Sequence, residues 1–417
     1  MSLLEVAREA ARLALKKGAR EASAGVYRAR HVEVAWRDGK LEKVAEATTR
    51  GAGVEVYVDG RYAAVSTSDL RPEALERVVE EAVALARSIA PDPHRRLPDP
   101  ALYLGQSGVD LQLFDPAHEA VDAPTRRRLA EAIEVAARQV PGAAKVLSIS
   151  TSVSDTASQG ALVHTNGFEG QRRSTDFWLG AEVAVLDPDG RRPEEYAATG
   201  DRFFASLESP EAVGRRAAAR AAGRLASALL GPMSASSLQQ KRSFLEGKLE
   251  TAIASPLLDW TDDPLIPRAF GSRHYDGEGM AAHPRRIVEA GVLQGWYVDT
   301  YYGRKLGLAP TTARPSNMTW KLGSKPRAAL LAEVGEGVLV TGFLGGNSNG
   351  TTGDFSLGVR GFAIRGGALA EPIGEMNVSG NQLDLWSRLA AVGDDPYPYS
   401  GLRSPTLVFD GVQIAGT

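Results

Sequence analysis

The sequence predicts an α+β fold in which helix and sheet units precede a mostly antiparallel β region. Apolar residues recur at helical spacing over residues 3–14 and again over 75–86. Between these segments, alternating apolar residues end at Asp38-Gly39 and Asp59-Gly60, and Asp-Gly is a strong signal for a β-hairpin. From Val338 onward, strand-like runs follow one another with a single helical segment among them.

Residues 1–90 are predicted to form a helix, a four-strand meander and a second helix. Ser2 and Glu5 make a capping box, so the first helix is expected to begin there and to end at Gly18. Two hairpins should follow, and the second helix should start at Pro72, because proline suits the first helical turn. The alternating residues of the hairpins are Val32, Val34, Trp36, Val54, Val56 and Val58.

A second unit of helix, strands and helix is expected over residues 124–232. It follows a segment, 91–123, whose prolines and weak periodicity predict a linker. Pro124 should lie at the start of the first helix, and Asn166-Gly167 and residues 187–190 should form turns between strands. Ser209-Pro210 should begin a long helix that ends at Gly231-Pro232.

Residues 233–417 are predicted to form a third, β-rich part. A helix is expected over 237–255, where Leu238, Leu245, Leu249 and Ile253 share one stripe. A hairpin should turn at Ala290-Gly291, between strands 285–289 and 292–299. Further strands are expected at 338–344, 355–364, 368–378 and 406–409, with Arg365-Gly366-Gly367 as a turn and a helix over 381–391.

Composition limits the classes of function. A chain of 417 residues suggests two or three domains. The net charge of −3 gives no basic field, so we expect no nucleic-acid binding. The chain has no Cys, which excludes disulfides, thiolate nucleophiles and Cys-containing zinc sites. Charged residues interrupt the N-terminal apolar pattern and no long apolar run occurs, so we expect a cytoplasmic protein without a membrane segment.

Charged and aromatic residues concentrate between residues 273 and 308, which makes this stretch the best candidate for a functional surface. His274, Asp276 and Glu278 are spaced two apart, and an extended chain would direct all three to one face. With His283 they are a candidate metal site. Against this interpretation, neighbouring glycines favour a loop whose charged side chains are solvated.

Three further patterns are weaker. Residues 346–350 match G-x-S-x-G, but no His follows His283, so a serine hydrolase triad in that chain order cannot be completed. His118-Glu119 resembles the start of HExxH, but Asp122 occupies the place of the second His and is better interpreted as a helix cap. The paired carboxylates Asp262 and Asp263 adjoin proline and are interpreted as turn residues.

Several spaced motifs in the second half resemble the TldD/TldE family, and within it the TldE type, also called PmbA. The motifs are 276–279 (DGEG), 291–295 (GVLQG), 304–307 (RKLG), 315–317 (PSN), 352–356 (TGDFS), 375–381 (EMNVSGN), 391–395 (AVGDD) and 404–416 (SPTLVFDGVQIAG). The family is also known as "modulator of DNA gyrase", although the charge of this chain gives no reason to expect direct DNA contact. One departure from the family pattern is the compact loop over 309–314.

The resemblance implies an intracellular metallopeptidase of two different subunits that degrades or matures short unfolded peptides. In the TldD-type subunit, a His-Glu-x-x-x-His motif and a Cys bind zinc, on a helix that corresponds roughly to 237–255 here. That range contains no His, and the chain contains no Cys. The resemblance therefore assigns this chain to the metal-free TldE type. It implies no catalytic residue and no cofactor here, with zinc in a TldD-type partner that forms a heterodimer with this chain.

We expect the partner or peptide surface of this chain to include aromatic and polar residues of two segments. Aromatic residues and Arg are enriched at binding hot spots. The candidates are Trp296, Tyr297, Tyr301, Tyr302, Arg304, Asn347, Asn349 and Asp354. The alternative is that the aromatic residues belong to the core of a β domain.

Two other functions stay open. The chain could be a self-sufficient metallopeptidase with an unusual site of His274, Asp276, Glu278 and His283, and bound metal in the isolated chain would favour this reading. It could instead be a non-enzymatic adaptor that forms a homodimer when alone. A neighbouring gene for a paralogue with His-Glu-x-x-x-His would favour the two-subunit peptidase over the adaptor.

Overall fold

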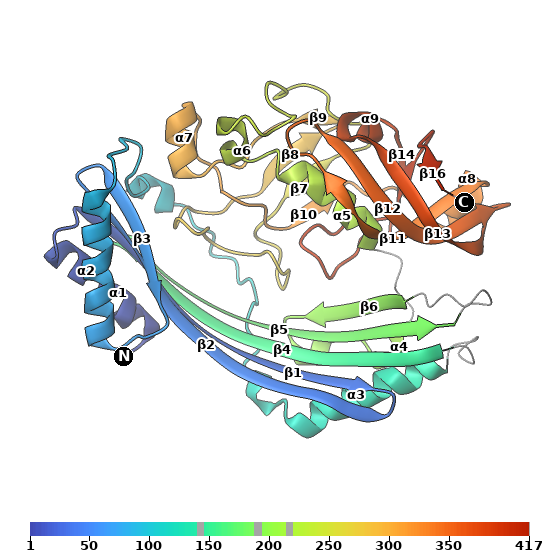
Figure 1. Ribbon diagram of the computed structural model, residues 1–417, viewed down its shortest axis with the longest axis horizontal. Helices are drawn as coiled ribbons and strands as arrows, with labels where there is room; N and C mark the ends of the chain where they lie inside the picture. The colour runs from blue at the N-terminus through green and yellow to red at the C-terminus, as the bar shows by residue number, and fades with distance from the viewer. Residues whose placement is uncertain (140–145, 187–193, 214–219, 417) are drawn as a thin grey trace. The chain divides into compact units, whose positions relative to one another are not determined.

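The structure is a computed structural model that describes residues 1–139, 146–186, 194–213 and 220–416 (Figure 1). The chain divides into two compact units. Unit 1 comprises Met1–Arg216 and Tyr275–Ala281, and unit 2 comprises Ala217–His274 and Ala282–Thr417. Strands pair in antiparallel fashion within the sheets of both units, and helices accompany them, so the predicted α+β class is confirmed.

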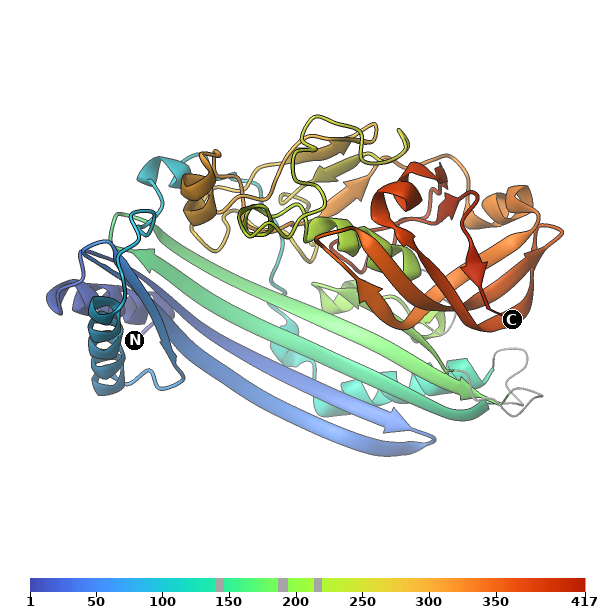
Figure 2. The same cartoon turned by 45° about the horizontal axis from the view of Figure 1, so that its top comes forward.

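Unit 1 is built on a six-stranded sheet with the strand order β3-β2-β1-β4-β5-β6. Its strands are β1 (Glu21–Arg37), β2 (Lys40–Val58), β3 (Arg61–Thr67), β4 (Val146–His164), β5 (Glu169–Val185) and β6 (Glu194–Asp201). Its helices are α1 (Leu3–Lys16), α2 (Pro72–Ser88), α3 (Ala123–Arg138) and α4 (Pro210–Val213), with the short 3₁₀ helices η1 (Pro100–Tyr103), η2 (His118–Ala120) and η4 (Phe204–Ser206). Figure 2 shows the long strands of this sheet running side by side.

Both Asp-Gly hairpins form as predicted, but the meander has three strands rather than four. Asp38 and Gly39 have φ angles of 47° and 77°, and Asp59 and Gly60 have 49° and 73°, as two-residue hairpin turns with positive φ at both positions require. The return strand of the first hairpin and the first strand of the second are one continuous strand, β2. Gly51 and Gly53 lie inside it but pair with Tyr27 and Gly25 of β1 without a turn, so the predicted break was wrong.

Two apolar cores cover different stretches of this sheet. The apolar faces of α1 and α2 pack on the first residues of β1 and the last residues of β2. The capping box of α1 is present, with the Glu5 N–H donating to Ser2 Oγ at 3.2 Å. Near the other end of β1, Trp36 packs with Ile133 of α3 and Leu179 of β5. The helices predicted at residues 3–14, 75–86 and from 124 are therefore confirmed.

The connection between α2 and α3 contains η1 and η2 and no strand of the sheet. Asp122 accepts a hydrogen bond from the N–H of Thr125 at 2.8 Å and caps α3, as predicted, while His118 lies in η2. The residues before and after this connection, 1–90 and 124–232, contribute strands to one sheet, because β1 pairs with β4. The role of 91–123 as a boundary between separately folding domains stays a prediction.

Some predicted features fall partly outside the described residues. The turn at Asn166-Gly167 lies between β4 and β5, where Gly167 has a φ of 111°. The turn predicted at 187–190 lies outside the described residues. Of the long helix predicted from Ser209-Pro210 to Gly231, α4 and α5 (Arg220–Leu230) are described, and residues 214–219 between them are not.

A small aromatic core in unit 1 surrounds His164. It contains Tyr103, Phe168 and Tyr275, and the His164 ring stacks on Tyr103 with a centroid distance of 5.7 Å. Phe168 contacts Tyr275 edge to face at 5.0 Å. Gly279 has a φ of 77°, and its backbone passes so close to the Phe168 ring that a Cβ would lie 2.9 Å from it. The DGEG motif is thus a tight turn against this core.

His164 should make the stability of unit 1 depend on pH. Burial lowers its pKa from the ordinary value of 6.5 to about 4. Because the unfolded state then binds more protons between these values, stability is complete above pH 6.5 and falls as the pH decreases toward 4. We expect a loss of about 2 kcal/mol at pH 5 relative to pH 7.5.

Urea unfolding at pH 5 and at pH 7.5 measures this loss of stability, and His164→Phe is the control. The variant keeps an aromatic ring but has no titrating group, so its stability should change less with pH than that of the wild type. Equal changes in the two proteins would contradict the assignment to His164.

The described residues of unit 2 form three sheets, with the orders β10-β7-β8-β9, β11-β12-β13-β16 and β14-β15. Its strands are β7 (Trp260–Asp262), β8 (Arg285–Glu289), β9 (Val292–Leu293), β10 (Met318–Trp320), β11 (Gly337–Ser348), β12 (Asp354–Arg365), β13 (Ala368–Asn381), β14 (Leu389–Val392), β15 (Leu407–Phe409) and β16 (Ile414–Ala415). Besides α5, its helices are α6 (Ala235–Gln239), α7 (Thr300–Leu306), α8 (Arg327–Val334) and α9 (Gln382–Ser387).

Three indole rings form the centre of the unit 2 core. Trp260 lies 5.0 Å from Trp320 and 6.0 Å from Trp386 between ring centroids, and Trp260 and Trp386 are 0% exposed. Aromatic pairs in this arrangement stabilise the fold beyond the contribution of the apolar area that they bury.

The predicted hairpin at Ala290-Gly291 is present, but its second strand, β9, covers only two residues. After β9 the chain turns to other partners, as the bond from the Tyr297 N–H to the Met233 carbonyl at 2.9 Å shows.

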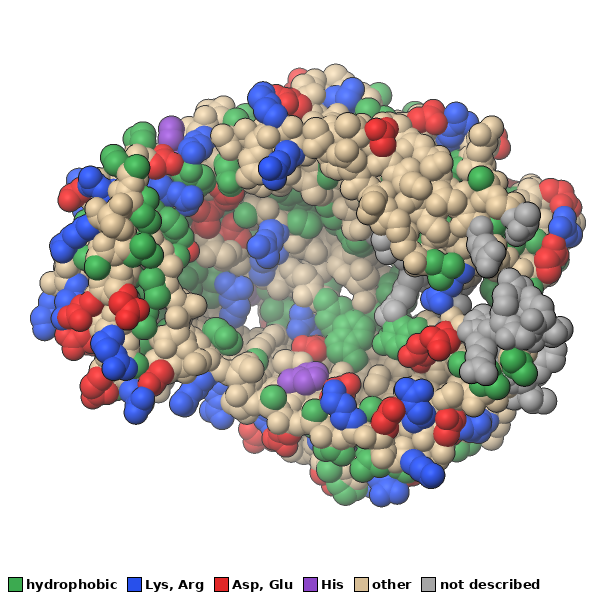
Figure 3. Space-filling model, in the orientation of Figure 1, with side chains coloured by type: hydrophobic (Ala, Val, Ile, Leu, Met, Phe, Trp, Pro, Cys, Tyr) green, Lys and Arg blue, Asp and Glu red, His purple; other side chains and the backbone are tan. Residues whose placement is uncertain are grey.

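The surface carries charges of both signs. On the face shown in Figure 3, Lys and Arg side chains are interspersed with Asp and Glu rather than gathered by sign. This agrees with the net charge of −3. Among the helices described here, none is long and apolar enough to cross a membrane.

Candidate functional site

Helix α7 presents three of the candidate surface residues. Asp299 begins the helix, because its side chain accepts a hydrogen bond from the N–H of Tyr302 at 2.7 Å. Gly307 ends it in the left-handed conformation, with a φ of 67°. The rings of Tyr301 and Tyr302 meet edge to face at 4.9 Å between centroids, and both residues are half-buried, as is Arg304. Each of these side chains therefore keeps surface that another molecule can contact.

Trp296 and Tyr297, just before α7, lie in the core. They are 8% and 2% exposed. The Tyr297 carbonyl accepts from the Ala235 N–H at 2.8 Å, and the Arg285 guanidinium lies 5.0 Å from the centre of its ring. Burial raises the pKa of Tyr297 well above its ordinary value, so its phenol stays neutral. A direct contact of these two residues with a partner stays a prediction.

The segment after α5 forms one short helix and then a series of turns, so the helix predicted over 237–255 is wrong. Helix α6 begins at the cap residue Ser234, whose side chain accepts from the Ser237 N–H at 3.2 Å, and ends at Gln239. Positive φ angles then follow at Lys241 (57°), Gly247 (74°) and Glu250 (58°). Backbone in this region cannot continue a right-handed helix.

This segment lies between α7 and the turn that joins β11 to β12. Helix α6 packs against α7 (Figure 1), and Gln240 Nε2 donates to Tyr302 Oη at 3.4 Å. A few residues later, the Phe244 N–H donates to the Gly350 carbonyl at 2.9 Å. One segment therefore connects the two groups of candidate residues, which the sequence separates by about 45 positions.

The β11–β12 turn is closed by its own hydrogen bonds. The Asn349 N–H donates to the Asp354 carbonyl at 2.7 Å, and the Gly353 N–H donates to the Asn349 carbonyl at 2.8 Å. Asn381 donates to the Asp354 carboxylate at 3.0 Å, and this bond lowers the pKa of Asp354. Asn347, Asn349 and Asp354 are all exposed. The turn is therefore a defined polar edge available to a partner or a peptide.

Ser348, the serine of the G-x-S-x-G match, is an exposed residue at the end of β11. A nucleophile elbow requires a strand followed directly by a helix, whereas here the chain turns into strand β12. The interpretation as a glycine-rich connection between strands is confirmed.

The alternative metal site does not assemble. Asp276 is buried, and its Oδ1 accepts from the N–H groups of Glu278 and Met280 at 2.8 and 3.1 Å. These hydrogen bonds hold residues 276–280 in a turn. The segment is therefore not extended, and its alternate side chains do not share one face. His283 is exposed. Within the described ranges, no group of three or more His, Asp or Glu side chains could hold a metal ion.

A buried polar network beside β7 and β10 was not predicted from the sequence. Asp262, interpreted as a turn residue, is only 2% exposed and accepts from the Ser316 N–H at 2.8 Å and from the Ser316 hydroxyl. Asn317, fully buried, donates to the Asp263 carbonyl and accepts from the Gly271 N–H. The PSN motif at 315–317 was the available signal. It fixes the loop beside β7 and β10 through hydrogen bonds that a buried group requires.

The side chains of the α6 segment do not fit zinc. The polar groups between residues 234 and 250 are hydroxyls, amides, cations and the carboxylates Glu246 and Glu250, both exposed. Structural and catalytic zinc sites use imidazole or thiolate, usually with at least three protein ligands. Neither group occurs in this stretch.

Three family models match the chain in order. They are described as PmbA/TldA metallopeptidase domain 1, central domain and C-terminal domain, and they match residues 22–86, 116–225 and 217–416.

Curated relatives match over nearly the whole chain. The Metalloprotease PmbA of Escherichia coli O157:H7 is 28% identical, over 95% of this chain and 92% of its own length. The Metalloprotease PmbA homolog of Haemophilus influenzae is 30% identical, over 98% of this chain and 94% of its own length.

Solved structures share the fold. A Bacteroides thetaiotaomicron protein, proposed in its name as a modulator of DNA gyrase, superposes with a TM-score of 0.94 at 33% identity, over 99% of this chain and 98% of that one. TldE from Thermococcus kodakarensis has a TM-score of 0.83 at 19% identity, over 99% of this chain and 100% of that one, which is a likeness of fold. With these matches along its length, the chain belongs to the PmbA/TldA metallopeptidase family, as its TldD/TldE-like motifs predict.

Proposed function

We propose that this chain is the metal-free subunit of a two-subunit zinc metallopeptidase that acts on short unfolded peptides. In this proposal, a TldD-type partner with the His-Glu-x-x-x-His motif holds the zinc ion and supplies the hydrolytic chemistry. This chain would bind the partner and help to hold the peptide.

One observation carries the proposal. The segment that corresponds to the zinc-binding helix of the TldD type is here the short helix α6 followed by turns, and it contains neither imidazole nor thiolate. Its turns are instead held by hydrogen bonds, since the Arg242 N–H donates to the Ser237 carbonyl at 2.8 Å and the Ser243 hydroxyl donates to the Pro232 carbonyl at 2.7 Å. The segment is built as a connector between α7 and the β11–β12 turn.

The side chains on the two elements that this connector joins suit contact rather than hydrolysis. Tyr301, Tyr302 and Arg304 on one side combine apolar surface with hydrogen-bond donors, as binding hot spots do. On the other side, Asn349 and Asp354 offer exposed polar groups in a closed turn. A partner could therefore bind α7 while a peptide contacts the β11–β12 turn.

Zinc content is the first test of this proposal. Protein purified alone and without a metal-binding tag should contain fewer than about 0.1 zinc ions per chain by elemental mass spectrometry, because the segment that corresponds to the zinc-binding helix has neither imidazole nor thiolate. Co-expression with a His-Glu-x-x-x-His paralogue should give a complex with about one zinc ion and peptidase activity that neither chain has alone.

A value near one zinc ion in the isolated chain would overturn the proposal and favour the self-sufficient peptidase, with His274 and His283 as the first residues to replace. A metal-free chain that binds no such paralogue and forms a stable homodimer would instead favour the adaptor.

A further inference from the structure

Four side chains form one row across the sheet of unit 1. Arg50 of β2 lies directly opposite Arg28 of β1. Arg28 also lies opposite Gln159 of β4, and Gln159 lies opposite Arg173 of β5. Residues that are directly opposite on neighbouring antiparallel strands project from the same face of the sheet. All four are exposed, so this arginine row presents three guanidinium groups and one amide over about 14 Å.

The arginine row lies on the face of the sheet that carries the helices. Val26 and Trp36 of β1 are an even number of positions from Arg28, and alternate residues of a strand share one face. Val26 packs in the core under α1 and α2, whereas Trp36 packs with α3. Figure 1 shows these helices near opposite ends of the sheet. Because Arg28 is exposed between the two cores, neither group of helices covers the row.

The row places like charges opposite each other without an acid between them. Arginines that are directly opposite on neighbouring strands repel each other and lower the stability of the sheet. Within the described ranges, neither Arg28 nor Arg50 forms an ion pair or a side-chain hydrogen bond. Arg30, two positions along β1 on the same face, pairs with Glu46 at 2.8 Å. The fold therefore neutralises the neighbouring cation and leaves these two arginines available to an anion from outside the chain.

Arg173 is held in position at the other end of the row. Its guanidinium lies 4.3 Å from the centre of the Phe114 ring, which belongs to the connection between α2 and α3. A guanidinium that stacks on an aromatic ring keeps the N–H groups at its edge available for an anion. No residue of the row is itself aromatic. The row thus offers charge and N–H donors but no ring of its own on which a nucleobase could stack.

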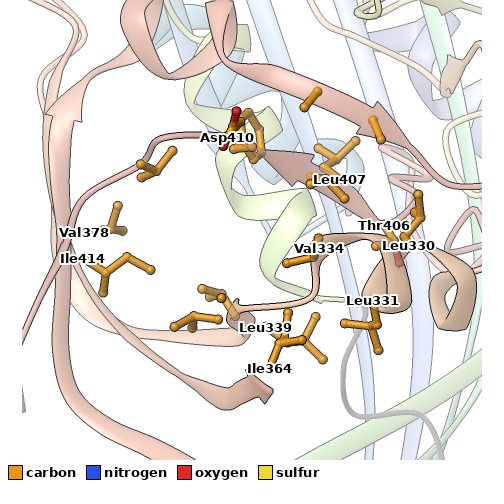
Figure 4. A pocket seen from close by; sticks show the side chains of 18 of the residues that line it. Leu330, Leu331, Val334, Leu339, Ile364, Val378, Thr406, Leu407, Asp410 and Ile414 are labelled. Atoms are coloured by element: carbon orange, nitrogen blue, oxygen red, sulfur yellow. The ribbon is translucent and has the colours of Figure 1, made fainter. Parts of the chain in front are cut away.

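Charged side chains around a cavity in unit 2 show the usual arrangement, in which opposite charges pair. Figure 4 shows this cavity of about 750 Å³, which is lined mostly by apolar side chains. Glu333 of the lining pairs with Lys325 at 2.5 Å, and Arg327 lies 3.6 Å from Asp395. These charges are satisfied within the fold and specify no ligand. The arginine row differs, and a local pattern that lowers stability without a compensating contact is typical of a functional site.

A phosphoryl group matches the pair of Arg28 and Arg50. Their Cβ atoms are about 5 Å apart because the two residues are directly opposite, so both guanidinium groups can reach one ligand group. A phosphate monoester carries about two negative charges and three acceptor oxygens at neutral pH, whereas a carboxylate carries one charge and two oxygens. One phosphoryl group therefore neutralises both arginines. Arg173 lies two strands from Arg28, about 10 Å away, and requires a second group of the same ligand.

We propose that the arginine row binds a polyphosphate anion, with one phosphoryl group between Arg28 and Arg50 and another at Arg173. The Gln159 amide lies between these two positions and donates to the phosphate chain that links them. A ligand that binds only the folded chain stabilises it, so the anion offsets the repulsion between the two opposed arginines. The row belongs to unit 1 and shares no residue with the candidate surface in unit 2, so the inference goes beyond the proposed function.

The test uses the full chain in a buffer without phosphate or sulfate, and the probe is inorganic tripolyphosphate. Isothermal titration calorimetry measures its affinity at about 50 mM and at about 200 mM salt. We expect a dissociation constant below about 100 μM at the lower salt concentration. Binding should be at least about fivefold weaker at the higher concentration, because salt screens exposed charges.

Arg28→Gln removes the central charge of the row and keeps an amide. We expect this variant to bind tripolyphosphate at least about tenfold more weakly than the wild type. Without the anion it should unfold at an equal or higher temperature, because one source of repulsion is gone. A lower unfolding temperature would identify Arg28 as a structural residue and overturn the inference.

Arg77→Gln is the matched control, because Arg77 is an exposed arginine of α2 in the same unit and lies outside the row. Its affinity for tripolyphosphate should stay within about twofold of the wild type. Equal losses of affinity in the two variants would show general attraction to positive charge and overturn the site.

The remaining outcomes concern the ligand. No detectable binding at about 1 mM tripolyphosphate would overturn the inference. Orthophosphate that binds as tightly as tripolyphosphate would contradict a ligand that reaches from Arg28 to Arg173. Hexaglutamate that binds more tightly than tripolyphosphate would assign the row to an acidic protein segment and likewise overturn it. None of these measurements involves zinc or peptidase activity, so a failure here is distinct from a failure of the proposed function.

Discussion

Replacing Asp155 by alanine is expected to lower the free energy of unfolding of unit 1 by about 3–5 kcal/mol. Asp155 Oδ2 lies 2.5 Å from Nε of Arg126, and the two side chains are 7% and 3% exposed. Removal of the carboxylate leaves a guanidinium charge in the core between α3 and β4 without its ion-pair partner. The cost of that buried charge, rather than the loss of one hydrogen bond, sets the size of the effect.

The same helix provides the control for this prediction. Arg127 and Glu131 of α3 form an ion pair at 2.8 Å, but their side chains are 58% and 39% exposed. Glu131→Ala should therefore change the free energy of unfolding by no more than about 0.5 kcal/mol. Urea unfolding followed by circular dichroism measures both variants.

A double variant separates burial of charge from loss of packing. Arg126→Met with Asp155→Leu removes both charges and keeps apolar volume, so it should recover most of the stability that Asp155→Ala loses. If Asp155→Ala costs less than about 1 kcal/mol, the unpaired Arg126 guanidinium does not carry the desolvation cost that its burial indicates.

The parts of the fold that were predicted from the sequence are those that local chemistry determines. The hairpin at Asp38-Gly39 follows from two residues that accept positive φ, and the hairpin at Ala290-Gly291 follows from Gly291. The caps Ser2 and Asp122 follow from side chains that accept the first N–H groups of a helix. The pairing of β1 with β4 joins residues more than 100 positions apart, and nothing in either strand specifies the other.

The error over residues 237–255 shows the limit of periodicity. Leu245 and Ile253 are buried as a helical stripe would bury them, but turns rather than a helix bring them to the core. Leu249, in the same stripe, is 38% exposed. Apolar spacing reports which side chains are buried, and it leaves open the backbone path that buries them.

Composition likewise leaves open which of the candidate surface residues are exposed. Aromatic residues between 296 and 302 serve either a core or a contact, and composition does not separate the two. In the structure, Trp296 and Tyr297 pack inward while Tyr301 and Tyr302 begin a capped helix and keep exposed surface. The Asp262 network was missed because Asp beside Pro is the usual pattern of a solvated turn, and only the fold brings Ser316 to it.

Replacing Tyr302 and Arg304 together by alanine is expected to weaken binding of a TldD-type partner by about 100-fold, or about 3 kcal/mol. Tyr302 is half-buried on α7, and its hydroxyl accepts a hydrogen bond from Gln240 of the connector. A partner that covers this helix would exclude water from the ring and the guanidinium together, and such desolvated Tyr and Arg side chains carry most of the energy of an interface. Titration of the partner by calorimetry measures the change.

The control must remove the same kinds of side chain without touching α7. Tyr399 is half-buried in unit 2 and contacts Tyr397 edge to face at 5.3 Å, much as Tyr302 contacts Tyr301 at 4.9 Å. Tyr399→Ala with Arg286→Ala should therefore leave the affinity within about twofold of the wild type. Both double variants should keep the thermal midpoint within a few degrees, because neither removes a core residue. Unchanged affinity of the Tyr302 and Arg304 variant would remove α7 from the interface and leave the exposed turn around Asn349 as the surface to test next.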